Sequence, residues 1–155
     1  MTTYNFSAQL TKGQHYEDTL DALFGAWYYI VEATPHQQRQ GIDRLWQRQD
    51  DYSRIVTVKY KADSLAGRTG NAFIETVSVN QPHTPGWAIT SQAKLLIYLV
   101  VDPQTIYMIW MRRLRTQLDR WQAHYPMRWV DNGRYHTGGH LVPLHELEKI
   151  AARVL

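Results

Sequence analysis

Three charged residues in the middle of the sequence could together perform metal-assisted or acid–base chemistry. Asp43 follows a glycine at the start of a predicted strand, Lys61 comes 18 residues later at the end of another, and Glu75 comes 14 residues after Lys61. A charge within an apolar strand is costly to bury without a partner, so we expect neighbouring strands to bring the three groups together. Two carboxylates can hold a divalent cation, and an ammonium group beside them can orient water or stabilise charge on a phosphoryl group.

The strand that ends near Lys61 has the clearest pattern in the chain. Residues 54–60 (RIVTVKY) alternate apolar and polar side chains, which predicts a strand with two unlike faces. The apolar face would carry Val56, Val58 and Tyr60, and the polar face Thr57, Lys59 and Lys61. Further strands are predicted at 27–34, 42–46, 72–79 and 95–101, and helices at 14–28, 111–125 and 144–155. This order predicts a mixed α/β fold with a sheet flanked by helices.

Composition excludes several classes of protein. The chain has 155 residues, 44% of them apolar, which suits one domain with a real core. It has no cysteine, which excludes disulfide scaffolds, iron–sulfur clusters and thiol nucleophiles. No stretch approaches ~18 uninterrupted apolar residues, and the polar start MTTYNFSAQLTKG lacks the apolar region of a signal peptide. We therefore expect a soluble, cytoplasmic protein without a membrane partner.

The arrangement of these residues resembles that of a known family. Glu17 on the first predicted helix, the sequence GID at 41–43 and an apolar strand ending in YK at 60–61 resemble the PD-(D/E)XK nuclease superfamily. The nearest members are the small Holliday-junction-resolvase-like and restriction-type endonucleases. The resemblance implies a restriction-endonuclease-like αβββαβ core at about 14–101, within a single domain that spans 1–155. A basic, aromatic and helical C-terminal extension would then occupy about 102–155.

The resemblance also implies a chemistry. Asp43 corresponds to the aspartate that binds magnesium, Lys61 to the family lysine, and Glu17 to an additional acid on the first helix. We therefore expect a DNA endonuclease that depends on magnesium or manganese. A homodimer is implied as well, because cutting two strands usually takes two sites.

One position departs from the family pattern. Lys59 occupies the place of the glutamate or aspartate that normally precedes the lysine by two residues. A cation cannot ligate magnesium and would repel it. Either another residue supplies the second acid, with Glu75 as our first candidate and Asp63 as another, or the chain keeps the fold for DNA binding or assembly without cleavage. In the first case Asp43 and Glu75 bind the metal, and Lys59 contacts a phosphate of the scissile strand.

Each of these charges also has a purely structural interpretation. Asp43 could pair with the adjacent Arg44, and the two lysines could solvate an edge strand and block aggregation. Glu75 could pair with either lysine across the sheet.

Arginine and aromatic residues are concentrated in the C-terminal third. Residues 112–134 carry a net charge of +4, against +3 for the whole chain. This favours contacts with phosphates and bases, although arginine stems on an amphipathic helix also cover apolar surface. The nucleic-acid-binding candidates are Lys59, Arg68, Arg112, Arg113, Arg115 and Trp87, and Gln92 is a possible polar helper at the metal site.

Some of these features have alternatives. The segment 68–71 (RTGN) suits a turn as well as a phosphate contact. Trp87 could belong to the core instead of stacking on a base. In YHTGGH at 135–140, the glycines disfavour the helix that a zinc site on His136 and His140 would need, so we predict a glycine-rich loop there.

Overall fold

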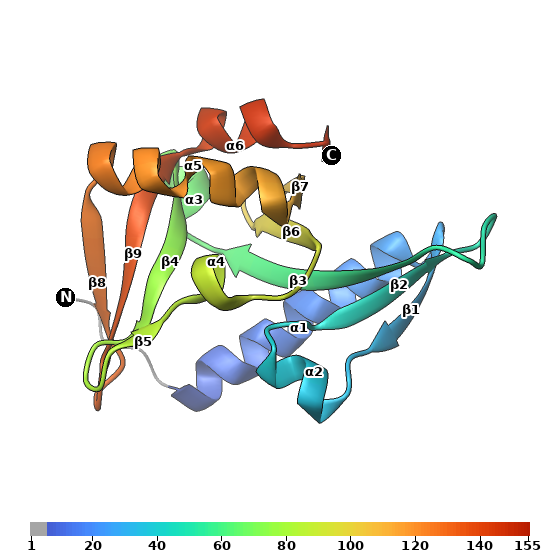
Figure 1. Cartoon of the computed structure of the whole chain (residues 1–155), viewed down its shortest axis with the longest axis horizontal. Coiled ribbons are helices and arrows are strands. Elements are labelled where there is room, and N and C mark those ends of the chain that lie inside the picture. The colour runs from blue at the N-terminus through green and yellow to red at the C-terminus, as the bar shows by residue number, and fades with distance from the viewer. Residues whose placement is uncertain (1–5) are drawn as a thin grey trace.

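Two β-sheets meet at an angle and share helices in the structure, a computed structural model that describes residues 6–155, with side chains from Thr11 onward (Figure 1). The helices of this part are α1 (Phe6–Phe24), α2 (Pro35–Arg39), α3 (Ala66–Thr69), α4 (Trp87–Thr90), α5 (Met111–His124) and α6 (Leu144–Ile150). The larger sheet has the order β1-β2-β3-β6-β7-β10, with bounds Tyr28–Glu32, Arg44–Arg48, Ile55–Asp63, Leu95–Val100, Thr105–Trp110 and Arg153–Val154. The smaller has the order β5-β4-β9-β8, with bounds Thr84–Pro85, Asn71–Val79, His136–Pro143 and Met127–Asp131.

The larger sheet is mixed. Strands β3 and β6 are parallel, and the other neighbouring pairs are antiparallel. A parallel pair needs a long crossover, and here the crossover contains α3, β4, β5 and α4. The mixed α/β class predicted from the sequence is confirmed, and strand β4 of the crossover becomes part of the second sheet.

Strand β3 has the two unlike faces predicted from its alternation. Val58 and Tyr60 are buried in a cluster with Leu20 and Phe24 of α1. The opposite face carries the lysines and is turned toward the crossover, because Lys61 lies over the ring of Trp87 in α4. Strand β3 lies between β2 and β6 only over its first part, because its pairing with β2 ends at Val58, and Lys59 and Lys61 lie beyond that point, where β6 alone flanks the strand.

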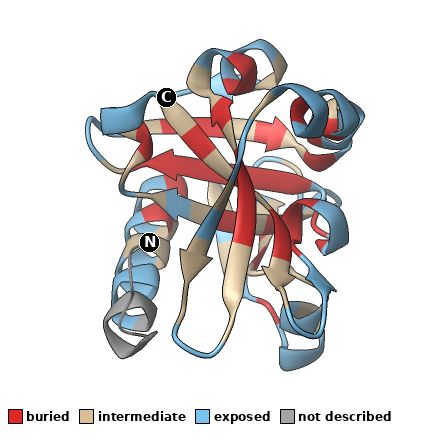
Figure 2. Cartoon of the chain, turned by 90° about the vertical axis from the view of Figure 1, so that its left-hand side faces the viewer, coloured by how far each residue is buried: buried red, intermediate tan, exposed pale blue. Residues whose placement is uncertain are grey.

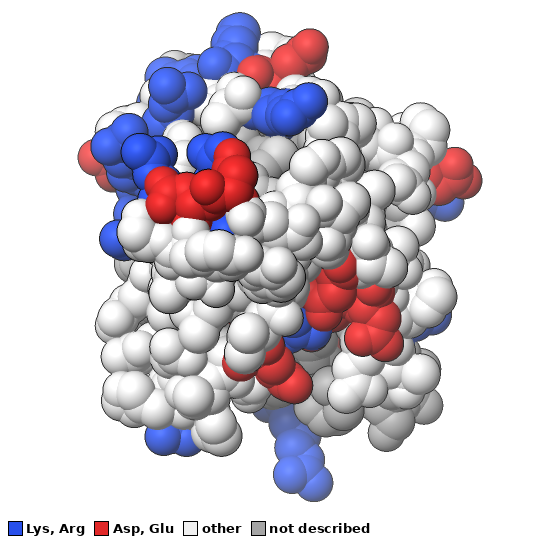
Figure 3. Space-filling model, turned by 90° about the vertical axis from the view of Figure 1, so that its right-hand side faces the viewer, with Lys and Arg blue, Asp and Glu red and all other residues white. Residues whose placement is uncertain are grey.

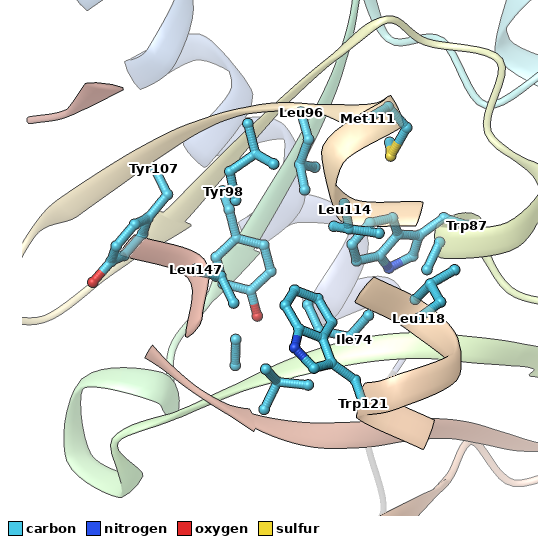
Figure 4. Close-up of a cluster of buried hydrophobic side chains, with 14 of the residues drawn as sticks. Ile74, Trp87, Leu96, Tyr98, Tyr107, Met111, Leu114, Leu118, Trp121 and Leu147 are labelled. Carbon is cyan, nitrogen blue, oxygen red and sulfur yellow. The ribbon is translucent and has the colours of Figure 1, made fainter. Parts of the chain in front are cut away.

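A second apolar cluster fills the space between the two sheets and the helices α5 and α6 (Figure 4). Every residue of β6 (LLIYLV) is buried, as expected for a strand covered on both faces. Leu114, Leu118 and Trp121 form the buried stripe of α5 that helical spacing predicts. Figure 2 shows the buried segments of the two sheets crossing near the middle of the molecule.

The C-terminal third is not the helical extension that we expected. It contains β7, β8, β9 and β10 as well as α5 and α6, and the segment predicted to be a glycine-rich loop is the first part of β9. A Cβ on Gly139 would lie 2.6 Å from the ring of Phe73, and one on Gly138 would lie 2.8 Å from the ring of Trp129. The two glycines therefore let aromatic rings from β4 and β8 lie directly on the backbone of β9.

Candidate functional site

The site lies where β2 separates from β3. Pairing between the two strands starts at Arg44 opposite Val58, whereas β3 continues to Asp63. Just before β2, Asp43 donates its backbone N–H to the Val58 carbonyl (2.8 Å), and its Oδ2 accepts the backbone N–H of Tyr60 (2.8 Å). The Asp43 carboxylate thus accepts a backbone hydrogen bond from the part of β3 that is not paired with β2.

Lys59 is the ion-pair partner of Asp43. The Lys59 Nζ lies 3.4 Å from Asp43 Oδ2, and the two side chains are only 16% and 19% exposed. A partly buried pair of this kind is screened less by water than a surface pair. Lys59 is therefore held against the aspartate, and it neutralises part of the charge that a metal would need.

Glu17 of α1 lies next to this pair and is tied to an arginine. Its carboxylate is 3.1 Å from Arg44 Nη2, and Arg44 Nε also contacts Asp21 (3.0 Å). Burial first, and then the negative charge of Asp43, raises the pKa of Glu17, so the two carboxylates lie close enough to interact. Arg44 donates to the backbone carbonyl of Asp43 (3.0 Å), so the expected ion pair between neighbouring side chains is replaced by pairs with α1.

Lys61 is half-buried, and its ammonium group has no hydrogen bond or ion pair with a described residue. Its Nζ lies 5.7 Å from the centroid of the Trp87 ring. Burial lowers the pKa of Lys61, and the positive charge of Lys59 adds to this, while Glu75 and Asp43 oppose it. The ammonium group therefore interacts electrostatically with both of the carboxylates that the sequence placed with it.

Glu75 reaches Lys61 from the second sheet. It lies on β4 directly before an irregularity in the pairing with β9, between Glu75 and Val77, where Thr76 and Val77 are both buried. Such a bulge re-aims the side chains beside it. Glu75 Oε1 accepts the backbone N–H of Trp87 at 3.4 Å, which ties the carboxylate to the start of α4.

Two hollows adjoin Lys61. One, of about 550 Å³, is lined by Lys12, Tyr16, Glu17, Asp43 and Lys59 among others. The other, of about 330 Å³, is lined by Asp63, Asn71, Phe73, Glu75 and Arg128 among others. Both are also lined by Lys61, Ala62, Ser64 and Leu65, so the end of β3 separates them. Sequence reasoning counted Arg128 only as part of the basic segment and did not place it at the site.

Carboxylates are the donor type that magnesium prefers, but the carboxylates of this site do not form a cluster of three or more. Among the described residues, no group of three or more histidine, aspartate or glutamate side chains could hold a metal ion. Asp43 Oδ1 and Glu75 Oε2 accept no hydrogen bond from a described residue. Magnesium is often held by one or two carboxylates and completed by water and substrate phosphates, so each carboxylate suits it in donor type, Asp43 in one hollow and Glu75 in the other.

Asp63 is not available as the second acid. Its Oδ1 accepts the backbone N–H groups of Leu65 (2.9 Å) and Ala66 (2.8 Å), and its Oδ2 accepts those of Phe73 (3.1 Å) and the Tyr98 hydroxyl (2.6 Å). All of these donors position α3 and β4 relative to β3. Asp63 therefore has a structural role at the end of the strand.

Several other predicted residues lie elsewhere. Trp87 is 6% exposed and belongs to the core, so the core alternative holds and the ring is not open to a base. Gln92 is exposed in the loop after α4, where its backbone N–H donates to the Gln40 carbonyl (2.8 Å), and it lines neither hollow. Arg68 is exposed at the end of α3, before Gly70, whose φ of 74° fits the predicted turn.

The arginines of α5 divide into two kinds. Arg115 donates to the backbone carbonyls of Ala88 (3.3 Å) and Ser91, so it joins α5 to α4. Arg112 and Arg113 are exposed on the same helix, and Arg113 donates to the backbone carbonyl of Ile150 (3.5 Å). Figure 3 shows Lys and Arg side chains gathering in the upper left of one face, with acidic side chains directly beside them and others elsewhere on that face.

Comparisons with known proteins give no relative. No protein family, curated protein or solved structure matches this chain. None of the described helices combines the length and apolar character that crossing a bilayer requires.

Proposed function

We propose that this protein is a metal-dependent DNA endonuclease that hydrolyses phosphodiester bonds. One observation carries the proposal: the half-buried Lys61 lines two hollows, one of them with Asp43 and the other with Glu75. The negative charges of Glu75, in the smaller sheet, and Asp43, beside the larger sheet, favour the charged form of its ammonium group. A cation with no hydrogen bond to the described protein retains its donors for a ligand, which is unusual for a group partly removed from water. The resemblance to the PD-(D/E)XK nucleases supports the same assignment.

Asp43 and Glu75 would hold magnesium or manganese through their uncommitted oxygens. When bound, such an ion polarises the phosphodiester and lowers the pKa of a coordinated water. Lys61 would donate hydrogen bonds to the phosphoryl oxygens and stabilise the negative charge that grows on them. Glu17, held by Arg44, would position the edge of the site next to Asp43.

A second candidate is DNA binding without cleavage, and the ion pair of Lys59 with Asp43 favours it. The pair places a positive charge against one of the two proposed metal ligands. In this case DNA affinity would persist without magnesium. The DNA affinity would fall as the salt concentration rises. This salt dependence would be weaker when Arg112 and Arg113 are neutralised, because fewer phosphates would be contacted.

The test uses supercoiled plasmid and a branched DNA with magnesium, manganese or EDTA. We would compare the natural protein with Asp43→Asn and Glu75→Gln, which keep the shape and an acceptor oxygen, and with Asp18→Asn as an exposed control on α1. Metal-dependent nicking that both site variants lose and Asp18→Asn keeps would establish the nuclease.

Two other results would contradict it. Cleavage that survives both Asp43→Asn and Glu75→Gln would show that the metal is held elsewhere. Retention of DNA on a gel without cleavage in either metal would establish the binding protein instead. The same preparations give the mass by light scattering, and a dimer would support paired cutting of two strands.

A further inference from the structure

The smaller hollow has the size and lining of a ligand pocket. Its volume of about 330 Å³ falls at the lower end of the ~300–1,000 Å³ typical of small-molecule sites. It lies between the end of β3 and the second sheet, and residues from β3, β4, β8 and β9 line it. Both sheets are therefore needed to form it.

Two cations line this hollow, and neither side chain has a hydrogen-bond or ion-pair partner among the described residues. Lys61 comes from β3 and Arg128 from β8. Arg128 is half-buried, and its guanidinium group forms no hydrogen bond or ion pair within the described part of the chain. Arginine and lysine together provide up to eight N–H donors, and such donors form their strongest hydrogen bonds with carboxylate or phosphate oxygens.

The two acidic residues of the hollow, Asp63 and Glu75, differ in how far they can neutralise these cations. Asp63 is surrounded by four hydrogen-bond donors and has little remaining capacity to accept. Glu75 keeps one uncommitted oxygen, and it acts electrostatically on Lys61. A bound phosphate is therefore expected to lie toward Arg128, with Lys61 between it and Glu75.

The rest of the lining suits an aromatic base. Phe73 lies against the bare backbone of Gly139, and Val130 and Leu141 add apolar surface beside it. Asn132 Nδ2 donates to Thr137 Oγ1 (2.8 Å), which leaves its amide oxygen as an acceptor. A flat aromatic surface with an amide at its margin is the usual combination for holding a nucleobase.

We propose that this hollow binds one unpaired nucleotide of a DNA strand, with its phosphate on Arg128 and Lys61 and its base against Phe73. A base can enter a concave pocket only after it leaves the stack, so the preferred substrate is single-stranded or distorted DNA. The inference deepens the proposed nuclease function and rests on it for the identity of the strand. Nucleotide binding itself can be measured without any cleavage.

The first experiment is an NMR titration of the full chain in EDTA with thymidine 5′-monophosphate, thymidine and inorganic phosphate. We expect the nucleotide to bind more tightly than either fragment, and Arg128→Gln to weaken it about tenfold through loss of charge-assisted hydrogen bonds. Arg134→Gln is the matched control, because Arg134 is exposed in the loop between β8 and β9 and does not line the hollow. It should leave the affinity unchanged.

A second variant tests the base. Phe73→Leu keeps an apolar side chain and should weaken nucleotide binding by several fold, as expected for loss of base stacking, while the affinity for inorganic phosphate stays the same. A thermal melt confirms that the variant is folded. Equal binding of phosphate and nucleotide, or equal loss in Arg128→Gln and Arg134→Gln, would overturn the proposal.

Fluorescence anisotropy with an oligonucleotide and its duplex tests the unpaired strand. Arg128→Gln should weaken binding of the single strand about tenfold and leave the duplex nearly unaffected. An equal loss for both forms would refute the requirement for an unpaired nucleotide. Nucleotide binding that depends on Arg128 in a protein that never cleaves would refute the nuclease and leave this inference standing.

Discussion

Glu146 and Lys61 are both at least partly removed from water, and their surroundings are opposite. Glu146 on α6 is 5% exposed, and its carboxylate accepts hydrogen bonds from Arg120 (2.5 and 3.2 Å), Trp121 Nε1 (3.3 Å) and the Tyr125 hydroxyl (2.9 Å). The ammonium group of Lys61 on β3 has no hydrogen bond to any described residue. One charge is fully satisfied by the protein, and the other is not.

The pKa shifts record the same difference. The hydrogen bonds from Arg120 lower the pKa of Glu146 to about 2, against the opposing effect of burial. Burial lowers the pKa of Lys61, so its surroundings penalise the charged form. A satisfied buried charge holds helices together, whereas an unsatisfied one costs stability and is retained where it has a ligand to bind.

The largest effect should come from Glu146→Gln. The substitution removes the charge of a buried carboxylate that accepts four hydrogen bonds, so we expect a loss of about 2 kcal/mol in the free energy of unfolding. Urea denaturation measures it, with exposed Glu148→Gln on the same helix as the control, which should stay within about 0.5 kcal/mol. Nicking by the folded fraction should be unchanged. A loss below 1 kcal/mol would mean that the Glu146 network is not a stabilising centre.

The opposite result is expected from Lys61→Met. Replacing a half-buried ammonium group that lacks a hydrogen bond by an apolar chain of similar length should leave the stability equal or higher. Nicking should fall about 100-fold, because the charge opposite the phosphoryl group is gone. Plasmid nicking rates and urea midpoints give the two quantities, and exposed Lys94→Met serves as the control. A variant that is destabilised but still active would place Lys61 with Glu146 as a structural residue.

Low pH should destabilise the protein mainly through protonation of Glu146. The folded pKa of Glu146 is about 2, below its ordinary value near 4.5, so the unfolded chain takes up the proton first. This contribution to stability is complete above about pH 5 and is lost as the pH falls toward 2. Urea midpoints measured at pH 5, 4 and 3 should fall, and the fall should be shallower in Glu146→Gln. Parallel curves for the two proteins would assign the acid sensitivity to other carboxyl groups.

The smallest effect is expected from Lys59→Met, which removes the cation that is paired with Asp43 at the proposed metal site. Without Lys59, the Asp43 carboxylate loses its ion-pair partner and keeps the hydrogen bond from the Tyr60 backbone N–H. We expect a loss of about 1 kcal/mol in stability and a several-fold lower magnesium concentration for half-maximal nicking. A higher magnesium requirement would instead show that Lys59 assists the reaction, as contact with a phosphate would.

Part of this site could be anticipated from sequence, because local patterns report which face of an element is apolar. The alternation in β3 placed Tyr60 with the core and Lys61 on the other face, and both hold in the structure. The interaction of Lys61 with Asp43 and Glu75 was also expected, although Glu75 arrives from a different sheet. The position of Glu75 in the smaller sheet depends on the pairing of β4 with β9, which no local sequence pattern encodes.

Other features follow only from contacts between distant segments. Gly138 and Gly139 form a strand because rings from two other strands cover them, whereas on their own they suggest a loop. Lys59 is neutralised by a residue 16 positions earlier. The sequence alone therefore determined the class of fold and the faces of its main elements, since these depend on the periodicity of neighbouring side chains. The tertiary structure decided which charges are satisfied, because a charge receives its partners from whichever segments pack against it.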